Sequence, residues 1–146
     1  ASLPRMKASG EESHIIATCS TSGFIAYPML GLYSASKFGI RGLMTSLRSE
    51  LAMSNSNIGV SIVCPGEVTT NIENKPVADI DPTAMLEVAA EDAQNTYPIS
   101  PLEAAQGSFA VIENKEFYIF THKGYKRQLE DISSEYLEAF NRAMFQ

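Results

Sequence analysis

Two short apolar runs lie on either side of a long helical pattern, and this arrangement restricts the possible fold more than any other feature. Residues 14–19 and 58–64 are rich in β-branched and other apolar side chains, as buried strands of a parallel sheet are. From residue 32 to residue 54 the pattern is helical, with an apolar stripe formed by Leu43, Leu47 and Leu51. A strand, a helix and a second strand form a βαβ unit, whose strands are parallel and whose crossover is right-handed.

The remaining sequence adds a third strand and further helices to this unit. Residues 1–10 read as the end of a helix, and residues 116–121 read as a third strand. The apolar spacing from Tyr125 onward predicts a final amphipathic helix. The predicted fold is therefore α/β, with about three parallel strands flanked by helices, like one half of a doubly wound sheet.

Two segments between the second and third strands are expected to be helical. Asp81-Pro82 is typical of a helix start, so a helical excursion is expected between the second strand and the next helix. Ser100-Pro101-Leu102-Glu103 has the pattern of a capping box with proline at the first helical position, and the helix it opens ends near Asn114. Four side chains are expected on the inner face of that helix: Leu102, Ala105, Phe109 and Ile112.

Composition excludes several classes of function. The chain has 146 residues, which fits one domain, and its net charge of −6 without a basic run argues against a nucleic-acid partner. The sequence has no run of 18 apolar residues, so no membrane span is predicted. The first residues lack the apolar core of a secretion signal. Cys19 and Cys64 each end an apolar run and are expected to be buried free thiols, which favours a reducing cytoplasm. His14 and His122 are expected to be structural, and no metal site is predicted.

Tyr33 and Lys37 are four residues apart, so both point from the same face of the predicted helix. A nearby lysine cation can lower the pKa of a tyrosine, ordinarily about 10, and such a pair can exchange a proton with an alcohol or carbonyl. This spacing alone is a weak pattern, and a surface tyrosine and lysine are the alternative. However, Ser20 and Pro65-Gly66 follow the first two strands, so they should meet the start of the helix at the carboxyl edge of the sheet.

Together these residues resemble the carboxyl-terminal half of a short-chain dehydrogenase/reductase. The resemblance rests on Ser20-Thr21-Ser22-Gly23 after the first strand, on Tyr33-Ser34-Ala35-Ser36-Lys37, and on Pro65-Gly66-Glu67-Val68-Thr69-Thr70 after the second. It covers essentially all of the chain and is strongest between residues 14 and 72. It implies a Rossmann-type fold, with residues 1–146 as one partial domain and a helical substrate lid at about residues 67–99.

The resemblance also implies an NAD- or NADP-dependent oxidoreductase that acts on a small alcohol or ketone. Tyr33 would be the general acid/base, Lys37 would lower its pKa and bind the nicotinamide ribose, and Ser20 would hold the substrate oxygen. Besides Tyr33 and Lys37, the implied cofactor contacts are Pro65, Gly66, Val68 and Thr70. The implied substrate contacts are Ser20, Ser22 and Tyr27.

The sequence departs from the family pattern in one important respect. It contains no Gly-x-x-x-Gly-x-Gly turn, which holds the phosphates of a dinucleotide at a helix N-terminus. We therefore expect the carboxyl-terminal half of an enzyme, inactive by itself; the alternative is a truncated, non-catalytic relative that serves as an interaction or dimerisation module. Within this family the helix at residues 33–54 is implied as a homo-oligomer contact, through small residues at positions 35, 39, 42 and 46. The substrate, the choice between NAD and NADP, and the direction of the reaction stay open.

Overall fold

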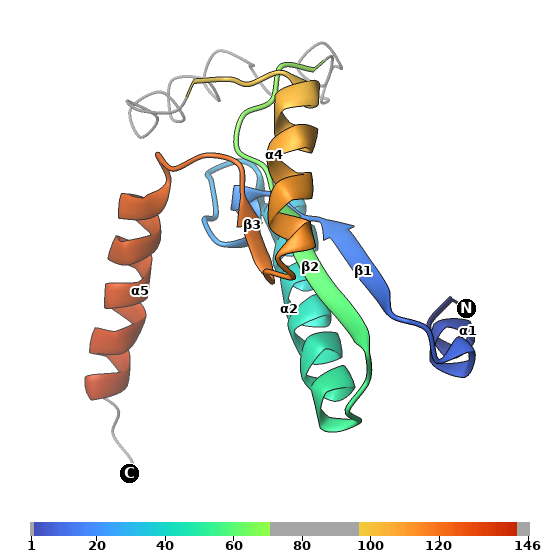
Figure 1. Cartoon of the computed structure of the whole chain (residues 1–146). Coiled ribbons are helices and arrows are strands. Elements are labelled where there is room, and N and C mark those ends of the chain that lie inside the picture. Colours follow the sequence, from blue (N-terminus) through green and yellow to red (C-terminus); the bar gives the residue numbers. More distant parts are fainter. Residues whose placement is uncertain (1, 71–96, 143–146) are drawn as a thin grey trace.

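A computed structural model describes residues 2–70 and 97–142, and its centre is a parallel sheet with the strand order β1-β2-β3 (Figure 1). The strands are β1 (Ser13–Thr18), β2 (Ile58–Cys64) and β3 (Tyr118–Phe120). The helices are α1 (Ser2–Ser9), α2 (Gly31–Met53), α4 (Pro101–Glu113) and α5 (Lys126–Asn141), with a short 3-10 helix, η1 (Thr21–Gly23). The predicted α/β fold with parallel strands is confirmed, whereas most of the predicted lid at residues 67–99 lies outside the described residues.

The register of the sheet brings the carboxyl ends of all three strands to one edge. β1 pairs with β2 from Ser13↔Ile58 to Thr18↔Val63. β2 pairs with β3 over its last three residues, ending at Cys64↔Phe120. α2 makes the crossover between β1 and β2 on one face of the sheet, and α4 lies on the other face (Figure 1). Residues that directly follow the strands therefore gather at a single carboxyl edge.

The hydrophobic core lies between α2 and the sheet. Ile62 of β2 is completely buried, and Met44 and Leu51 of α2 pack in the same cluster. The predicted leucine stripe is wrong at one position, because Leu43 is 68% exposed. Each step of four residues turns a helix by roughly 400°, which is about 40° more than a full turn. Leu43 and Leu51 are two such steps apart, so their side chains point about 80° away from each other. Ile40 and Met44 contact the core in its place.

The inner face of α4 also differs from the prediction. The capping box is present, since Ser100 Oγ accepts a hydrogen bond from Glu103 N and Glu103 Oε2 accepts one from Ser100 N. Leu102 and Phe109, however, are 65% and 64% exposed, Ala105 is also exposed, and Ile112 is half-buried. The buried residue is Ser108, whose hydroxyl donates to Ala104 O at 2.7 Å within the helix. A small side chain with a satisfied hydroxyl permits close packing, so the larger apolar side chains are turned outward.

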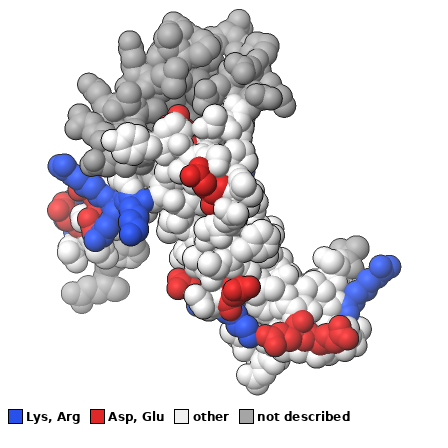
Figure 2. All heavy atoms as spheres, turned by 45° about the horizontal axis from the view of Figure 1, so that its top comes forward, with Lys and Arg blue, Asp and Glu red and all other residues white. Residues whose placement is uncertain are grey.

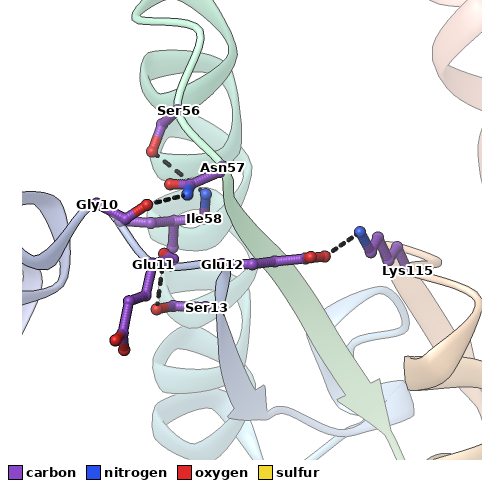
Figure 3. Close-up of polar contacts among 8 residues, drawn as sticks. All are labelled: Gly10, Glu11, Glu12, Ser13, Ser56, Asn57, Ile58 and Lys115. Carbon is purple, nitrogen blue, oxygen red and sulfur yellow. Dashed lines mark hydrogen bonds and ion pairs between the residues drawn. The ribbon is translucent and has the colours of Figure 1, made fainter.

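Polar contacts fasten the starts of the strands at the opposite edge of the sheet (Figure 3). Asn57 Nδ2 donates to Gly10 O at 2.7 Å, which joins the end of α1 to the start of β2. Lys115, which follows α4, forms an ion pair with Glu12, and its hydrogen bond and charge lower the pKa of the Glu12 carboxyl. Both side chains are about two-thirds exposed, so this ion pair adds little to stability.

His14 has the structural role that the sequence predicts. Its Nε2 atom lies 2.8 Å from Ser61 Oγ on the neighbouring strand, and the Ser61 hydroxyl donates to Glu116 O at 2.6 Å. A Cβ atom at Gly59 would overlap the His14 ring, so the ring occupies the space that glycine leaves open. These contacts satisfy a fully buried serine and link β1, β2 and the segment before β3.

Large apolar side chains remain exposed on the helices. On α5 the predicted amphipathic helix is present, but Tyr136 and Phe140 are 59% and 80% exposed. Figure 2 shows charged side chains at the left and along the lower edge of one face, and acidic side chains also near its middle, with uncharged residues between these groups. Within residues 2–70 and 97–142, no helix has the length and apolar character that crossing a bilayer requires.

Candidate active site

The chain segments that follow β1 and β2 remain hydrogen-bonded to each other beyond the sheet. Cys19 N donates to Val63 O at 2.7 Å, and Thr21 N donates to Pro65 O at 2.9 Å. Ser20 lies between these two linked residues, and its hydroxyl accepts a hydrogen bond from Ser22 N at 3.1 Å, which caps η1. The structure therefore brings Ser20 and the Pro65-Gly66 turn together at the carboxyl edge.

The first turns of α2 are packed directly onto the segment after β1. Cys19 Sγ donates to Lys37 O at 3.3 Å. A Cβ atom at Gly23 would lie 2.5 Å from Cys19 Sγ and 3.0 Å from Lys37 O, so glycine permits this close approach. The backbone of Lys37 is thus held beside Ser20 by two residues of the loop that carries Ser20.

Tyr33 and Lys37 project from the same side of α2. Lys37 Nζ lies 5.5 Å from the centroid of the Tyr33 ring, which is within the range of a cation–π contact. Tyr33 is 39% exposed and Lys37 is half-buried. The carboxyl edge therefore presents a phenol hydroxyl, an ammonium group and the Ser20 hydroxyl on adjoining segments, which is a set of groups able to bind and protonate a substrate oxygen.

Val68 lies on the far side of the Pro65-Gly66 turn in an isolated parallel bridge with Ile99. The bridge uses Glu67 O, which accepts from Ile99 N at 3.2 Å, and Thr69 N, which donates to Ile99 O at 2.9 Å. Because hydrogen-bonding groups alternate sides along an extended chain, the amide and carbonyl of Val68 itself face away from Ile99. These groups have the donor and acceptor that a carboxamide requires.

The other predicted contact residues have different environments. Ser22 is buried and Tyr27 is half-buried, whereas Thr70 is exposed at the border of the described residues. Ser34, next to Tyr33, is also buried, and no described residue is a hydrogen-bond partner of its hydroxyl. Substrate contact by Ser22 and Tyr27, and cofactor contact by Thr70, stay predictions.

Three residues that sequence reasoning did not assign to the site surround Gly66. Gly66 N donates to Thr121 Oγ1 at 3.2 Å and to His122 Nδ1 at 3.3 Å, and a Cβ atom at Gly66 would lie 2.5 Å from the Tyr125 ring. Thr121 and His122 directly follow β3, so the rule that placed Ser20 and Pro65 at the carboxyl edge could also have identified them.

The two cysteines are buried free thiols, as the sequence predicts. Burial, and to a smaller extent the neighbouring Cys19, raise the pKa of the Cys64 thiol to about 12. Cys64 therefore stays protonated at neutral pH and has no character of a nucleophile. Within the described ranges, no three histidine, cysteine or acidic side chains are arranged to hold a metal ion.

Two surface hollows lie at the amino-terminal ends of the strands, on the side that Figure 3 shows. One, of about 370 Å³, is lined by residues that include Glu12, His14 and Lys115. The other, of about 470 Å³, is lined by residues that include Lys7, Ser54 and Asn57. The tyrosine, lysine and serine of the carboxyl edge line neither hollow, so these hollows are not the candidate active site.

Comparison with known proteins gives consistent matches. The model of the short chain dehydrogenase family matches residues 1–81. A 1-deoxy-11-beta-hydroxypentalenate dehydrogenase from Streptomyces avermitilis is 32% identical over 129 residues, which are 88% of this chain and 43% of that protein. A CLA biosynthesis dehydrogenase/reductase from Lactiplantibacillus plantarum is 29% identical over 143 residues, covering 88% of this chain and 49% of that protein. The chain thus spans less than half the length of both relatives.

Solved structures are similar over nearly the whole chain. A short chain dehydrogenase/reductase from Burkholderia phymatum in complex with NAD superposes with a TM-score of 0.72 at 27% identity, covering 91% of this chain and 52% of that one. A short-chain dehydrogenase from Streptomyces avermitilis has a TM-score of 0.69 at 24% identity and shares the fold. The three parallel strands and the helices beside them thus have the arrangement of a Rossmann-type fold.

Proposed function

The chain belongs to the short chain dehydrogenase family, and we propose that it carries the proton-transfer half of an NAD(P)-dependent oxidoreductase. The proposal rests on two contacts: the loop that carries Ser20 contacts the backbone of Lys37 through Cys19, and Lys37 Nζ lies 5.5 Å from the centre of the Tyr33 ring. The contact between Cys19 and Lys37 and the bond from Thr21 N to Pro65 O hold their segments together. A sheet edge of this kind is where open α/β folds bind their ligands.

Each of the three side chains has a distinct role in the proposed reaction. The Tyr33 hydroxyl gives a proton to the substrate oxygen during reduction and removes it during oxidation. Lys37 Nζ, 5.5 Å from the centre of the Tyr33 ring, places a positive charge beside the tyrosine during this exchange. The Ser20 hydroxyl donates a hydrogen bond to the substrate oxygen, where charge develops in the transition state.

The residues at the carboxyl edge suit a nicotinamide cofactor. When bound, the nicotinamide supplies or accepts the hydride. The amide and carbonyl of Val68, which face away from Ile99, match the carboxamide group, and Lys37 and Tyr33 can bind ribose hydroxyls. The similar protein from Burkholderia phymatum was solved with NAD, which supports this class of cofactor for the chain.

We propose a small, largely apolar alcohol or ketone as the substrate, and a cytoplasmic location because both buried thiols are free. The whole protein should oxidise NADH or NADPH in the presence of such ketones. The 146-residue chain alone should not bind either cofactor, because its sequence has no Gly-x-x-x-Gly-x-Gly turn.

A ketone panel and calorimetry test these statements separately. The panel contains apolar ketones and matched phosphorylated or carboxylated ketones, and the consumption of NADH and NADPH is followed by the absorption of the reduced nicotinamide. Turnover of apolar ketones supports the proposal, a preference for anionic ketones contradicts the substrate class, and no turnover contradicts the oxidoreductase. Calorimetry measures cofactor binding by the 146-residue chain alone, and stoichiometric binding would contradict the prediction that this chain binds neither cofactor.

We further propose that α2 contacts a second copy of the protein. Leu32, Leu43 and Met53 of this helix are 92%, 68% and 86% exposed, and Gly39 and Gly42 leave open space for a close approach. The alternative of a non-catalytic dimerisation module rests on the same surface. Both readings require that this apolar face is covered in solution.

Sedimentation of a charged variant tests the α2 contact. Leu43→Glu is expected to shift the protein from oligomer to monomer, because a carboxylate cannot be buried there without a partner. Leu137→Glu on α5, where the leucine is 66% exposed, is the matched control and should leave the oligomer intact. A monomeric wild-type protein, or an unchanged Leu43→Glu oligomer, contradicts the contact. If the protein is an oligomer, turnover of ketones by the whole protein supports the enzyme, and absence of turnover supports the non-catalytic dimerisation module.

A further inference from the structure

His122 contacts two backbone segments that are far apart in the sequence. Its Nδ1 atom lies 3.3 Å from Gly66 N and 2.7 Å from Thr121 Oγ1. Its Nε2 atom lies 3.1 Å from Tyr97 O, in the segment that leads into α4. One imidazole ring therefore joins the turn after β2 to the segment before α4.

The partners determine where the hydrogen atoms on this ring lie. Tyr97 O is a carbonyl and can only accept, so Nε2 carries the hydrogen and donates it. Gly66 N can only donate, so Nδ1 accepts. The Thr121 hydroxyl donates to Nδ1 at 2.7 Å, which is the shorter of the two contacts to that lone pair, and the single N–H of Gly66 is shared between Thr121 Oγ1 at 3.2 Å and Nδ1 at 3.3 Å. With the hydrogen of the ring on Nε2, both ring nitrogen atoms have partners of the right kind.

The ring is also confined by its neighbours. A Cβ atom at Gly66 would lie 2.8 Å from His122 Nδ1, so the ring packs against the bare backbone of the turn. The Tyr125 ring meets it edge to face, with 6.2 Å between the ring centres. The bridge between Val68 and Ile99 joins the same two segments a few residues away. His122 therefore forms a second connection between the turn after β2 and the segment before α4, which the bridge already aligns.

We propose that His122 is a positioning residue for hydride transfer, an inference that rests on the function proposed above. Through Nδ1 it fixes the Gly66 turn, against which the nicotinamide is proposed to bind. Through Nε2 it fixes the backbone at Tyr97 relative to that turn. In this proposal it acts through these two segments and not on the reacting atoms.

The two nitrogen atoms can be tested one at a time in the whole protein. His122→Asn places an amide oxygen near the position of Nδ1 and can keep the acceptor for Thr121 and Gly66. His122→Gln reaches the position of Nε2 and can keep the donor to Tyr97 O. His122→Ala removes both, and Lys123→Ala, at the exposed neighbouring residue, is the matched control.

The expected result is a split between the variants in the KM for NAD(P)H. His122→Gln and His122→Ala should raise this KM about fivefold, as expected for the loss of one hydrogen bond, whereas His122→Asn should stay within about twofold of wild type. A merely structural histidine would lower the melting temperature in all three variants without such a split. Equal KM values in all three variants overturn the positioning role, and absence of turnover in the wild-type protein overturns the proposed function as well.

Nitrogen-15 NMR of the wild-type protein labelled at histidine tests the arrangement without any variant. The His122 ring should carry its hydrogen on Nε2, with an unprotonated Nδ1, at neutral pH. A hydrogen on Nδ1 would overturn the inference, even if every variant failed to fold. This measurement does not depend on turnover, so it distinguishes a wrong histidine geometry from a wrong proposed function.

Discussion

Tyr33→Phe in the whole protein is expected to lower kcat for ketone reduction by about two to four orders of magnitude, because it removes the proposed proton donor. The substitution deletes one hydroxyl and keeps the aromatic ring, so the contact with Lys37 Nζ at 5.5 Å from the ring centre is retained. Tyr33 is 39% exposed, so no deeply buried group loses a partner. The loss should therefore appear in kcat at saturating NAD(P)H, with little change in the melting temperature.

Tyr136→Phe is the matched control for this substitution. Tyr136 lies on α5, far from Tyr33 in the sequence, and is 59% exposed. Tyr136→Phe therefore removes the same hydroxyl group at a residue outside the candidate active site. Its kcat should equal that of the wild-type protein. If Tyr33→Phe retains turnover within tenfold of wild type, Tyr33 is not the general acid/base, although the fold and the family would be unaffected.

The arrangement of the candidate site could be predicted because few topologies are open to a strand, a helix and a strand. A right-handed crossover between parallel strands leaves Ser20 and Pro65 at one edge and starts the helix near it. The hydrogen bond from Thr21 N to Pro65 O and the contact of Cys19 Sγ with Lys37 O show that these segments do lie together. The identity of the proton donor needed more than topology, since the spacing of Tyr33 and Lys37 occurs on many helices.

Side-chain direction and long-range polar contacts could not be predicted in the same way. The apolar spacing of α4 pointed to Phe109 as an inner residue, yet the helix approaches the sheet through Ser108, because a small side chain permits closer packing. His122 is 56 residues from Gly66 and 25 from Tyr97, so its contacts exist only after the sheet has formed. Hydrophobic periodicity carries no information about such contacts.

The second large effect is expected at Gly23, where the helix carrying Lys37 meets the loop carrying Ser20. A Cβ atom there would lie 2.5 Å from Cys19 Sγ and 3.0 Å from Lys37 O, and the second of these atoms is backbone that cannot rotate away. Gly23→Ala should therefore push α2 from the loop and lower the free energy of unfolding by about 1–3 kcal/mol. Urea unfolding of the chain measures this change directly.

Two further variants show whether the contact itself is the cause. Gly107→Ala, inside α4 with open space around the glycine, should raise the free energy of unfolding by up to about 1 kcal/mol, because alanine favours a helix. Adding Cys19→Ala to Gly23→Ala removes the sulfur atom that the new methyl group meets, so the double variant should recover part of the lost stability. Strictly additive effects would mean that the two residues do not press on each other. In that case Lys37 would be held beside Ser20 by the rest of the α2 packing, and Gly23 would not be needed for the site.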